Sequence, residues 1–271
     1  MEQHGNNQQQ LVTAIIPARF ASTRLPGKLL LPLAGKPLIL HTLDRARAAR
    51  NVSRVIVATD DARIFDVVSQ AGGEAVMSSA EHRSGSDRIA EAAESLPEGS
   101  VIVNVQGDEP MLPSATIEIA VDAMLRDDSA DIVTTSERIE DYRDVISPDV
   151  VKVVTDSDGY ALYFSRSPIP FPRVVSDGDG DGDLENALAN EPKLIEVFRK
   201  HTGLYVYRRA FLLRFAKMEP TVLERTEMLE QLRAIENGAR IKVVEARESS
   251  IGVDCEEDYE RVRALMETEN V

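Results

Sequence analysis

The sequence predicts an α/β fold: a mostly parallel, twisted sheet with helices on both faces, plus an antiparallel inserted lobe. In the first half of the chain, short runs rich in β-branched residues alternate with amphipathic segments, an order typical of parallel sheets between helices. In the second half, two strand-like runs flank Ser157-Asp158-Gly159, whose glycine can adopt the positive φ of a hairpin turn. That hairpin predicts the antiparallel part.

Each predicted element follows from the spacing of its apolar residues. Buried strands are expected at 12–16, 54–58, 101–105 and 131–134. The helices between them each place their apolar residues on one face: Ile39, Leu43 and Ala46; Ile64, Val68 and Ala71; and Ile117, Val121, Met124 and Leu125. The second half is expected to contain a hairpin of 151–156 with 160–165, a strand at 201–207, helices at 210–217 and 222–237, a strand at 241–246 and a closing helix at 256–267.

Composition limits the class of protein. The chain has 271 residues, 43% of them hydrophobic and 28% charged, with 31 Lys and Arg against 46 Asp and Glu, a net charge of −15. We expect a disordered tail at 1–10 and a single domain at 11–271 with an embedded lobe around 137–220. The negative charge argues against proteins that bind nucleic acids or membrane surfaces through a cationic face.

The cysteine count, the first ten residues and the length of the apolar stretches bear on where the protein is found. The one cysteine, Cys255, cannot form an internal disulfide, and residues 1–10 lack the apolar core of a secretory signal. No stretch approaches the roughly 20 apolar residues that a membrane-spanning helix needs. We therefore expect a cytoplasmic protein.

The first expected strand leads into a cationic loop at 17–28. Arg19 and Arg24 provide planar guanidinium groups and Lys28 a compact charge, and ligands of open α/β sheets bind where strands end. The spacing matches neither the Walker phosphate loop nor the dinucleotide-binding glycine pattern. The residues predict a different kind of phosphate loop, with an ordinary surface loop as the alternative.

Carboxylates follow the third expected strand. Gly107 lets a ligand approach the backbone, and Asp108 and Glu109 provide oxygen ligands of the kind Mg²⁺ prefers. Asp108 is the expected metal ligand, although a Gly-Asp pair after a strand is often only a turn. Asp254 could bring a second carboxylate to the same edge of the sheet, or could simply cap the closing helix.

A polar helix face could bind a polyhydroxylated ligand. On the helix expected at 222–237, one face carries Glu227, Glu230 and Gln231, and the opposite, apolar face carries Met228, Leu232 and Ile235. A solvated polar face is the alternative. His201, Tyr205 and Tyr207 alternate along one strand and project from the same side, where a histidine more often has a structural role.

The acidic run Asp177–Asp183 has aspartates at alternate positions, as at the start of an EF-hand calcium loop. Its twelfth position, however, is Leu188 instead of a carboxylate. A mobile, solvated loop is the favoured interpretation, and weak cation binding the alternative.

Seven blocks in order strongly resemble the 3-deoxy-manno-octulosonate cytidylyltransferase family, also called CMP-Kdo synthetases. They are IIPARFASTRLPGK, HRSGSDR, NVQGDEP, VKVV with GYALYFSRSPIP, HTGLYVY, EMLEQLR, and GVD with EDYERVR. The resemblance covers residues 11–266. It implies a homodimer with the nucleotide-sugar transferase type of sheet and a magnesium-dependent enzyme. The implied reaction transfers CMP from CTP to the anomeric hydroxyl of Kdo and releases pyrophosphate, in the cytoplasmic branch of lipopolysaccharide synthesis.

The resemblance also implies roles for single residues. Arg19, Arg24 and Lys28 would bind the triphosphate, and Ala18 with Ser84, Gly85, Ser86 and Asp87 would help to hold the cytidine. Asp108 and Asp254 would hold Mg²⁺, with Asp108 also beside the nucleotide. Gln106, Arg166, His201, Tyr205, Glu230 and Gln231 would surround Kdo. The residues expected to carry catalysis are Arg19, Lys28, Asp108 and Asp254.

Departures from the family pattern leave alternatives open. Residues 176–191 do not align with it, and Cys255-Glu256 replaces a Thr-Pro helix start, which by cap preference could weaken the closing helix by about 1 kcal/mol. A cytidylyltransferase for another sugar acid, such as 8-amino-Kdo or sialic acid, remains possible. A non-catalytic nucleotide-binding protein of the same fold is disfavoured, because it would need neither Lys28 nor the two aspartates.

Overall fold

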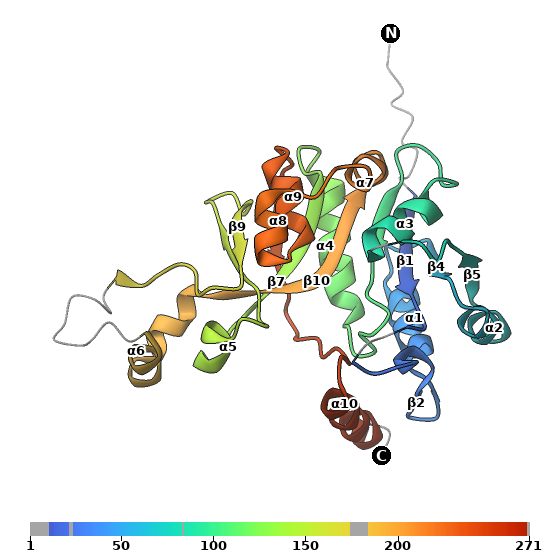
Figure 1. Cartoon of the computed structure of the whole chain (residues 1–271), viewed down its shortest axis with the longest axis horizontal. Coiled ribbons are helices and arrows are strands. Elements are labelled where there is room, and N and C mark those ends of the chain that lie inside the picture. Colours follow the sequence, from blue (N-terminus) through green and yellow to red (C-terminus); the bar gives the residue numbers. More distant parts are fainter. Residues whose placement is uncertain (1–10, 22–23, 83, 174–183, 270–271) are drawn as a thin grey trace, which may run out of the picture. The chain divides into compact units, whose positions relative to one another are not determined.

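The structure is a computed structural model that describes residues 11–21, 24–82, 84–173 and 184–269 (Figure 1). The chain forms two compact units, the first of Met1–Ser114, Tyr207–Ala216 and Ile251–Val271, the second of Ala115–Val206 and Lys217–Ser250. The tail at 1–10 and the acidic run at 177–183 lie outside the described residues. The single domain at 11–271 with a lobe around 137–220 stays a prediction.

The first unit is built on a parallel sheet, as the strand and helix alternation predicts. Its strand order is β6 (Val101–Asn104), β1 (Val12–Ala18), β4 (Arg54–Thr59) and β5 (Glu74–Met77). In the register, Ala14 of β1 lies between Val103 and Val55, and all three are buried. β5 was not expected from the sequence, because it is short and only partly buried.

The helices of the first unit use the predicted faces. α1 (Leu38–Ala48) buries Ile39, Leu43 and Ala46. α2 (Ala62–Gln70) buries Ile64 and Val68, whereas Ala71 follows the helix and is exposed. The remaining elements of this unit are η1 (Lys28–Leu30), β2 (Pro32–Leu33), β3 (Lys36–Pro37), α3 (Gly85–Ala93), α7 (Arg209–Phe215) and α10 (Glu256–Glu269).

The second unit contains the predicted antiparallel hairpin. β8 (Lys152–Thr155) pairs with β9 (Ala161–Ser165), and Gly159 in the turn has a φ of 79°. Lys152 of β8 also pairs antiparallel with Lys200 of β10 (Arg199–Arg208). β7 (Ile132–Arg138) and β11 (Ile241–Glu245) form a parallel pair. The helices are α4 (Ser114–Arg126), α5 (Tyr142–Ile146), α6 (Leu184–Asn190), α8 (Val222–Glu227) and α9 (Glu230–Glu236), with η3 (Pro192–Val197).

The helix expected at 222–237 is two helices, so this prediction was wrong. Met228 ends α8 in the left-handed conformation, with a φ of 54°, and interrupts the helical hydrogen bonds. It is 76% exposed instead of lying on a buried face, whereas Leu232 of α9 is buried as expected. A capping interaction supports the start of α8, where the Thr221 N–H donates to Glu224 Oε2 at 3.2 Å.

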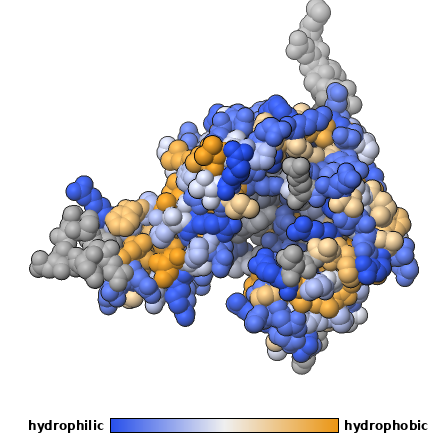
Figure 2. Space-filling view, in the orientation of Figure 1, coloured by the Kyte–Doolittle hydropathy of each residue, from blue (hydrophilic) through white to orange (hydrophobic). Residues whose placement is uncertain are grey.

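The surface agrees with the charged composition. The face drawn in Figure 2 is mainly hydrophilic, with smaller apolar areas between the polar ones. Within the part of the chain that the structure describes, no helix has both the length and the apolar character required to span a bilayer.

Candidate active site

A cavity of about 310 Å³ lies in the first unit, where β1 and β6 end and α3 begins. This is the edge of a parallel sheet at which ligands bind in open α/β folds. The cavity is lined by Pro17, Ala18, Arg19, Arg24, Lys28, Leu29, His82, Ser84, Gly85, Arg88, Gln106, Gly107, Asp108 and Asp254. It therefore brings together the cationic loop, the start of α3 and both predicted metal-binding aspartates.

The cationic loop turns sharply at Gly27. This glycine has a φ of 69°, and its N–H donates to the Phe20 carbonyl at 3.2 Å. A Cβ at Gly27 would lie 3.0 Å from Cζ of the Phe20 ring, so any side chain there would require the ring to shift. The guanidinium carbon of Arg63 lies 3.4 Å from the centre of the same ring. Phe20 thus fixes the base of the loop that carries Arg19, Arg24 and Lys28.

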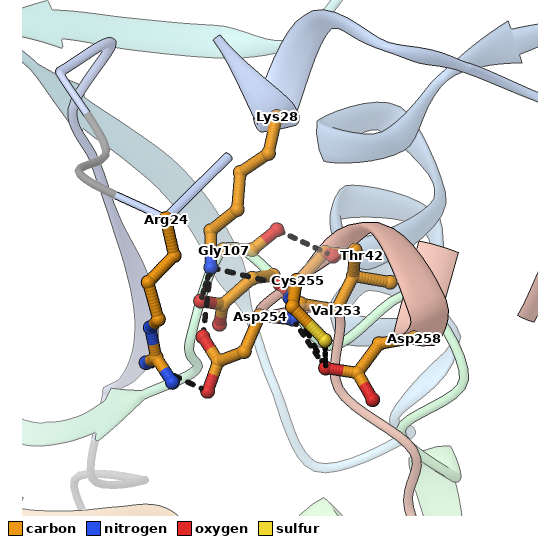
Figure 3. Close-up of polar contacts among 9 residues, drawn as sticks. Arg24, Lys28, Thr42, Gly107, Val253, Asp254, Cys255 and Asp258 are labelled. Carbon is orange, nitrogen blue, oxygen red and sulfur yellow. Dashed lines mark hydrogen bonds and ion pairs between the residues drawn. The ribbon is translucent and has the colours of Figure 1, made fainter. Parts of the chain in front are cut away.

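Lys28 connects the two aspartates. Its Nζ lies 2.5 Å from Asp108 Oδ2 and 3.0 Å from Asp254 Oδ1, and it donates to the Val253 carbonyl at 2.8 Å (Figure 3). Arg24 Nη2 lies 3.0 Å from the other oxygen of Asp254. The two carboxylates are 146 positions apart in the sequence, yet both contact one nitrogen atom. The predicted convergence of Asp108 and Asp254 is confirmed.

Backbone contacts explain why the aspartates meet. The Val253 N–H donates to the Asp108 carbonyl at 2.8 Å, which joins the segment before α10 to the loop after β6. A Cβ at Gly107 would lie 3.0 Å from the Pro17 carbonyl, so a glycine lets the loops after β1 and β6 come close. The Thr42 hydroxyl, from α1, donates to the Gly107 carbonyl at 3.0 Å.

The alternative role of Asp254 as a helix cap is not what the structure shows. Asp258 accepts the N–H groups of Asp254 and Cys255, at 3.0 and 3.1 Å, and so supports the start of α10 from inside the helix. The Asp254 carboxylate instead contacts Lys28 and Arg24. It is therefore available to the cavity and does not act as the cap of α10.

The charge of Lys28 is stabilised. Burial alone would lower its pKa, but attraction to Asp108 and hydrogen bonds to both aspartates outweigh burial and raise the pKa above its usual 10.5. A positive charge is therefore favoured between the two carboxylates. Among the described residues no group of three or more His, Cys, Asp or Glu side chains could hold a metal. Two carboxylates still suit Mg²⁺, which usually takes one or two from the protein and the rest from phosphates and water.

Of the five residues predicted to hold the cytidine, three line the cavity and two do not. Ser84 and Gly85, at the start of α3, line the cavity, as does Ala18. Ser86 is buried and Asp87 is used as a cap: the Asp87 N–H donates to Ser84 Oγ and the Ser84 N–H to Asp87 Oδ2, both at 3.2 Å. Neither Ser86 nor Asp87 is part of the cavity lining.

Sequence reasoning missed Arg88. This α3 side chain lines the cavity and is 4% exposed, and its guanidinium lies 2.7 Å from Asp60 Oδ2 and donates to Ser78 Oγ. The partners lie at the ends of β4 and β5, so they could not be paired with Arg88 from spacing alone. The position of Arg88 four residues after the α3 cap, Ser84, was the available signal.

Of the residues predicted to surround Kdo, Gln106 lines the cavity, and its Nε2 donates to Asn104 Oδ1 at 3.2 Å. The others belong to the second unit: Arg166, His201, Tyr205, Glu230 and Gln231. The His201 ring contacts the rings of Phe164 and Tyr205, at centroid distances of 4.9 and 5.3 Å.

The hydrogen bonds of His201 define its tautomer. Thr134 Oγ1 donates its proton to the Leu204 carbonyl at 2.7 Å, so at 2.9 Å from His201 Nε2 it must act as an acceptor. His201 therefore carries its proton on Nε2, and Nδ1 is an acceptor. Burial lowers the pKa of His201 to about 3, so the ring is neutral at pH 7.

Arg166 is held by α8 and by a buried lysine. Its Nε donates to the Glu227 carbonyl at 2.7 Å, and its backbone N–H to Glu227 Oε2 at 2.9 Å. Lys152 is fully buried and donates to the carbonyls of Ser147, Val150 and Arg166, at 2.8, 2.5 and 2.7 Å. Glu227 therefore supports Arg166 instead of sharing a ligand-facing surface with Glu230 and Gln231. Of these two, Gln231 is 5% exposed and the Glu230 side chain is 40% exposed.

Comparisons with known proteins identify the family of this chain. A family model described as Cytidylyltransferase matches residues 13–241. The 3-deoxy-manno-octulosonate cytidylyltransferase of Geobacter sulfurreducens is 52% identical over 251 residues, which are 93% of this chain and 97% of the relative. The enzyme of the same name from Solibacter usitatus is 45% identical over 94% of each chain. The chain belongs to the 3-deoxy-manno-octulosonate cytidylyltransferase family.

Solved structures extend the comparison. A CMP:2-keto-3-deoxy-manno-octonic acid synthetase, solved in complex with CTP, is 37% identical to this cytidylyltransferase, with a TM-score of 0.85 over 96% of this chain and 100% of the other. The 4-diphosphocytidyl-2C-methyl-D-erythritol synthase of Anaerococcus prevotii is 17% identical, with a TM-score of 0.58 over 96% and 99% of the chains, and shares the fold. The predicted α/β fold of the nucleotide-sugar transferase type is confirmed.

Proposed function

We propose that this cytidylyltransferase transfers CMP from CTP to the anomeric hydroxyl of Kdo and releases pyrophosphate. The observation that carries the proposal is the contact of Lys28 with both Asp108 and Asp254 inside the cavity. The chain is also about half identical, over nearly its whole length, to relatives named for this reaction.

The reaction needs positioning and charge neutralisation more than a covalent nucleophile. In-line attack on a phosphorus proceeds when the attacking oxygen is aligned and the phosphoryl charge is balanced. We assign Arg19, Arg24 and Lys28 to the triphosphate, because all three line the cavity beside the start of α3. The sugar acid and the triphosphate are both anionic, and each pair of charges 4 Å apart repels by about 1 kcal/mol even in water. These three cations oppose that repulsion locally in a chain of net charge −15.

Asp108 and Asp254 are the residues that would hold Mg²⁺. When bound, the ion would neutralise phosphoryl oxygens and lower the pKa of the attacking hydroxyl. The hydrogen bond from the Val253 N–H to the Asp108 carbonyl keeps the two carboxylates on the same side of the cavity. Gly107 lets that loop lie against the end of β1.

The sugar-binding role of the second unit is part of the proposal. Arg166 supplies a guanidinium suited to a carboxylate, and its orientation is maintained by Glu227. His201, neutral and with Nδ1 as an acceptor, suits a sugar hydroxyl better than a carboxylate. We assign Gln106, Tyr205, Glu230 and Gln231 to the same ligand, on the basis of the family resemblance.

The wider context is proposed on the same basis. We infer that the enzyme is a homodimer, works in the cytoplasm and serves lipopolysaccharide synthesis. Sedimentation at micromolar concentration tests the dimer.

A pyrophosphate-release assay with CTP and, in parallel, Kdo, 8-amino-Kdo and sialic acid tests the substrate. We expect Kdo to be used best. Release with sialic acid and not with Kdo would reverse the assignment. Calorimetric binding of CTP without turnover of any of the three acids would favour a non-catalytic nucleotide-binding protein.

Asp108→Asn tests the metal site. We expect CMP transfer to fall by at least about 100-fold at millimolar Mg²⁺ while the unfolding temperature changes little. Asp122→Asn is the control, because Asp122 contacts Arg126 on α4, in the other unit. Full activity of Asp108→Asn at low Mg²⁺ would remove Asp108 from the metal site.

A further inference from the structure

The residues assigned to the phosphates and those assigned to the metal hold each other. Lys28 contacts both aspartates, and Arg24 contacts the second oxygen of Asp254 (Figure 3). Two positive charges thus balance two negative ones. In the proposed reaction, however, Lys28 and Arg24 bind phosphates, and Asp108 and Asp254 bind Mg²⁺.

We propose that Lys28 occupies the position of the divalent cation and must leave Asp108 and Asp254 before the cation can bind them. Nucleotide phosphates attract Lys28 and Arg24 and free the carboxylates, so nucleotide and cation bind with positive coupling. The inference rests on the proposed function, because it takes the assignments of phosphate and metal ligands from it.

The donor count of Lys28 makes a phosphate compete with the acceptors that Lys28 already has. A lysine ammonium has three N–H donors, and Lys28 has three acceptors: Asp108 Oδ2, Val253 O and Asp254 Oδ1, at 2.5, 2.8 and 3.0 Å. The side chain is 12% exposed, so water contributes little to its hydrogen bonding. Lys28 can therefore donate to a phosphate only after it gives up at least one of these acceptors.

The exchange requires little backbone movement. The Lys28 N–H donates to the Leu25 carbonyl at 3.2 Å, and its carbonyl accepts from Leu31 at 3.1 Å, so η1 fixes the backbone there. Four rotatable side-chain bonds are enough to move the ammonium group. Asp108 is held through its carbonyl by Val253 and can keep its place.

Charge balance sets the sign of the coupling. With Lys28 in place, a divalent cation meets two carboxylates whose charge is already balanced, and binding is weak. Once phosphates draw Lys28 away, two negative carboxylates remain beside the anionic nucleotide, and a divalent cation is strongly favoured. By linkage, the cation must strengthen nucleotide binding by the same factor.

Mn²⁺ binding to the protein without nucleotide tests the inference, with free Mn²⁺ followed by electron paramagnetic resonance. We expect Lys28→Met to bind Mn²⁺ at least about 10-fold more tightly than the unchanged protein, since couplings of this kind span about 5- to 150-fold. Lys28→Arg keeps a cation between the aspartates and should bind Mn²⁺ weakly. The gain should be lost in the double variant Lys28→Met, Asp108→Asn.

Lys36→Met is the matched control, because Lys36 contacts Asp44 in the same unit but does not line the cavity. It should leave Mn²⁺ affinity unchanged, which separates a local effect from a change in net charge. Equal Mn²⁺ affinity of Lys28→Met and the unchanged protein would overturn the inference, as would equally tight binding by Lys28→Arg and Lys28→Met. Transfer of CMP from CTP in excess chelator would instead overturn the metal dependence in the proposed function.

Discussion

His201 should make this protein lose stability in mild acid. Burial lowers its pKa from the usual 6.5 to about 3, so between these values the unfolded chain binds a proton that the native state does not. Stability is therefore complete above pH 6.5 and falls as the pH decreases toward 3. The slope is at most about 1.4 kcal/mol per pH unit, and the whole window limits the loss to about 5 kcal/mol. Because the residue His201 as a whole is partly exposed, about 5 kcal/mol is an upper limit for this loss.

The assay compares the unfolding free energies of the protein and His201→Gln in urea at pH 7.5, 6.5, 5.5 and 4.5. Both proteins have the same carboxylates, so the contribution of the carboxylates cancels in the difference between the two unfolding free energies. We expect the variant to lose about 1 kcal/mol less per pH unit below 6.5. Tyr205→Leu, which removes a ring neighbour of His201 but keeps the imidazole, should retain the original slope. Parallel curves for the protein and His201→Gln would refute the reasoning.

Two further substitutions test features that the sequence did not explain. Lys152→Met should lower the free energy of unfolding by about 2–4 kcal/mol, because three partly buried carbonyls lose the donor that the buried Lys152 provides. Lys193 is exposed, so Lys193→Met should change the free energy of unfolding little, and chemical denaturation measures both. Gly27→Ala should strain a positive φ by about 1–2 kcal/mol, displace Phe20 and raise the KM for CTP. Gly35→Ala has the same kind of strain with open space around it, so an equal rise in KM there would exclude displacement of Phe20 as the cause.

Local patterns determined much of the fold. The β-branched runs predicted β1, β4, β6 and β7, since buried parallel strands need continuous apolar residues. The Asp-Gly turn predicted the β8–β9 hairpin because its glycine takes the positive φ that such a turn requires. The cationic loop after β1 was predicted for a similar reason, as ligand-binding loops follow strand ends.

Local patterns failed where a long-range contact decided the outcome. Apolar spacing around Met228 favours one continuous helix, yet the chain turns there into the left-handed conformation and α9 starts anew. Glu227, at the end of α8, consequently accepts hydrogen bonds from Ser165 and Arg166, more than 60 positions away. The spacing of apolar residues along a helix does not show which distant residues its polar side chains will bind.

The sequence by itself determined the types of groups present: two arginines and a lysine after one strand, and an aspartate after another. Only the tertiary structure decided that Asp254 and Asp108 both contact Lys28. The hydrogen bond from the Val253 N–H to the Asp108 carbonyl brings the two segments together. Secondary structure follows from interactions between residues that are close in the sequence, so the local sequence is enough to predict it. The site depends on contacts between segments 80 and 226 positions apart, which exist only after the sheet has brought its strand ends together.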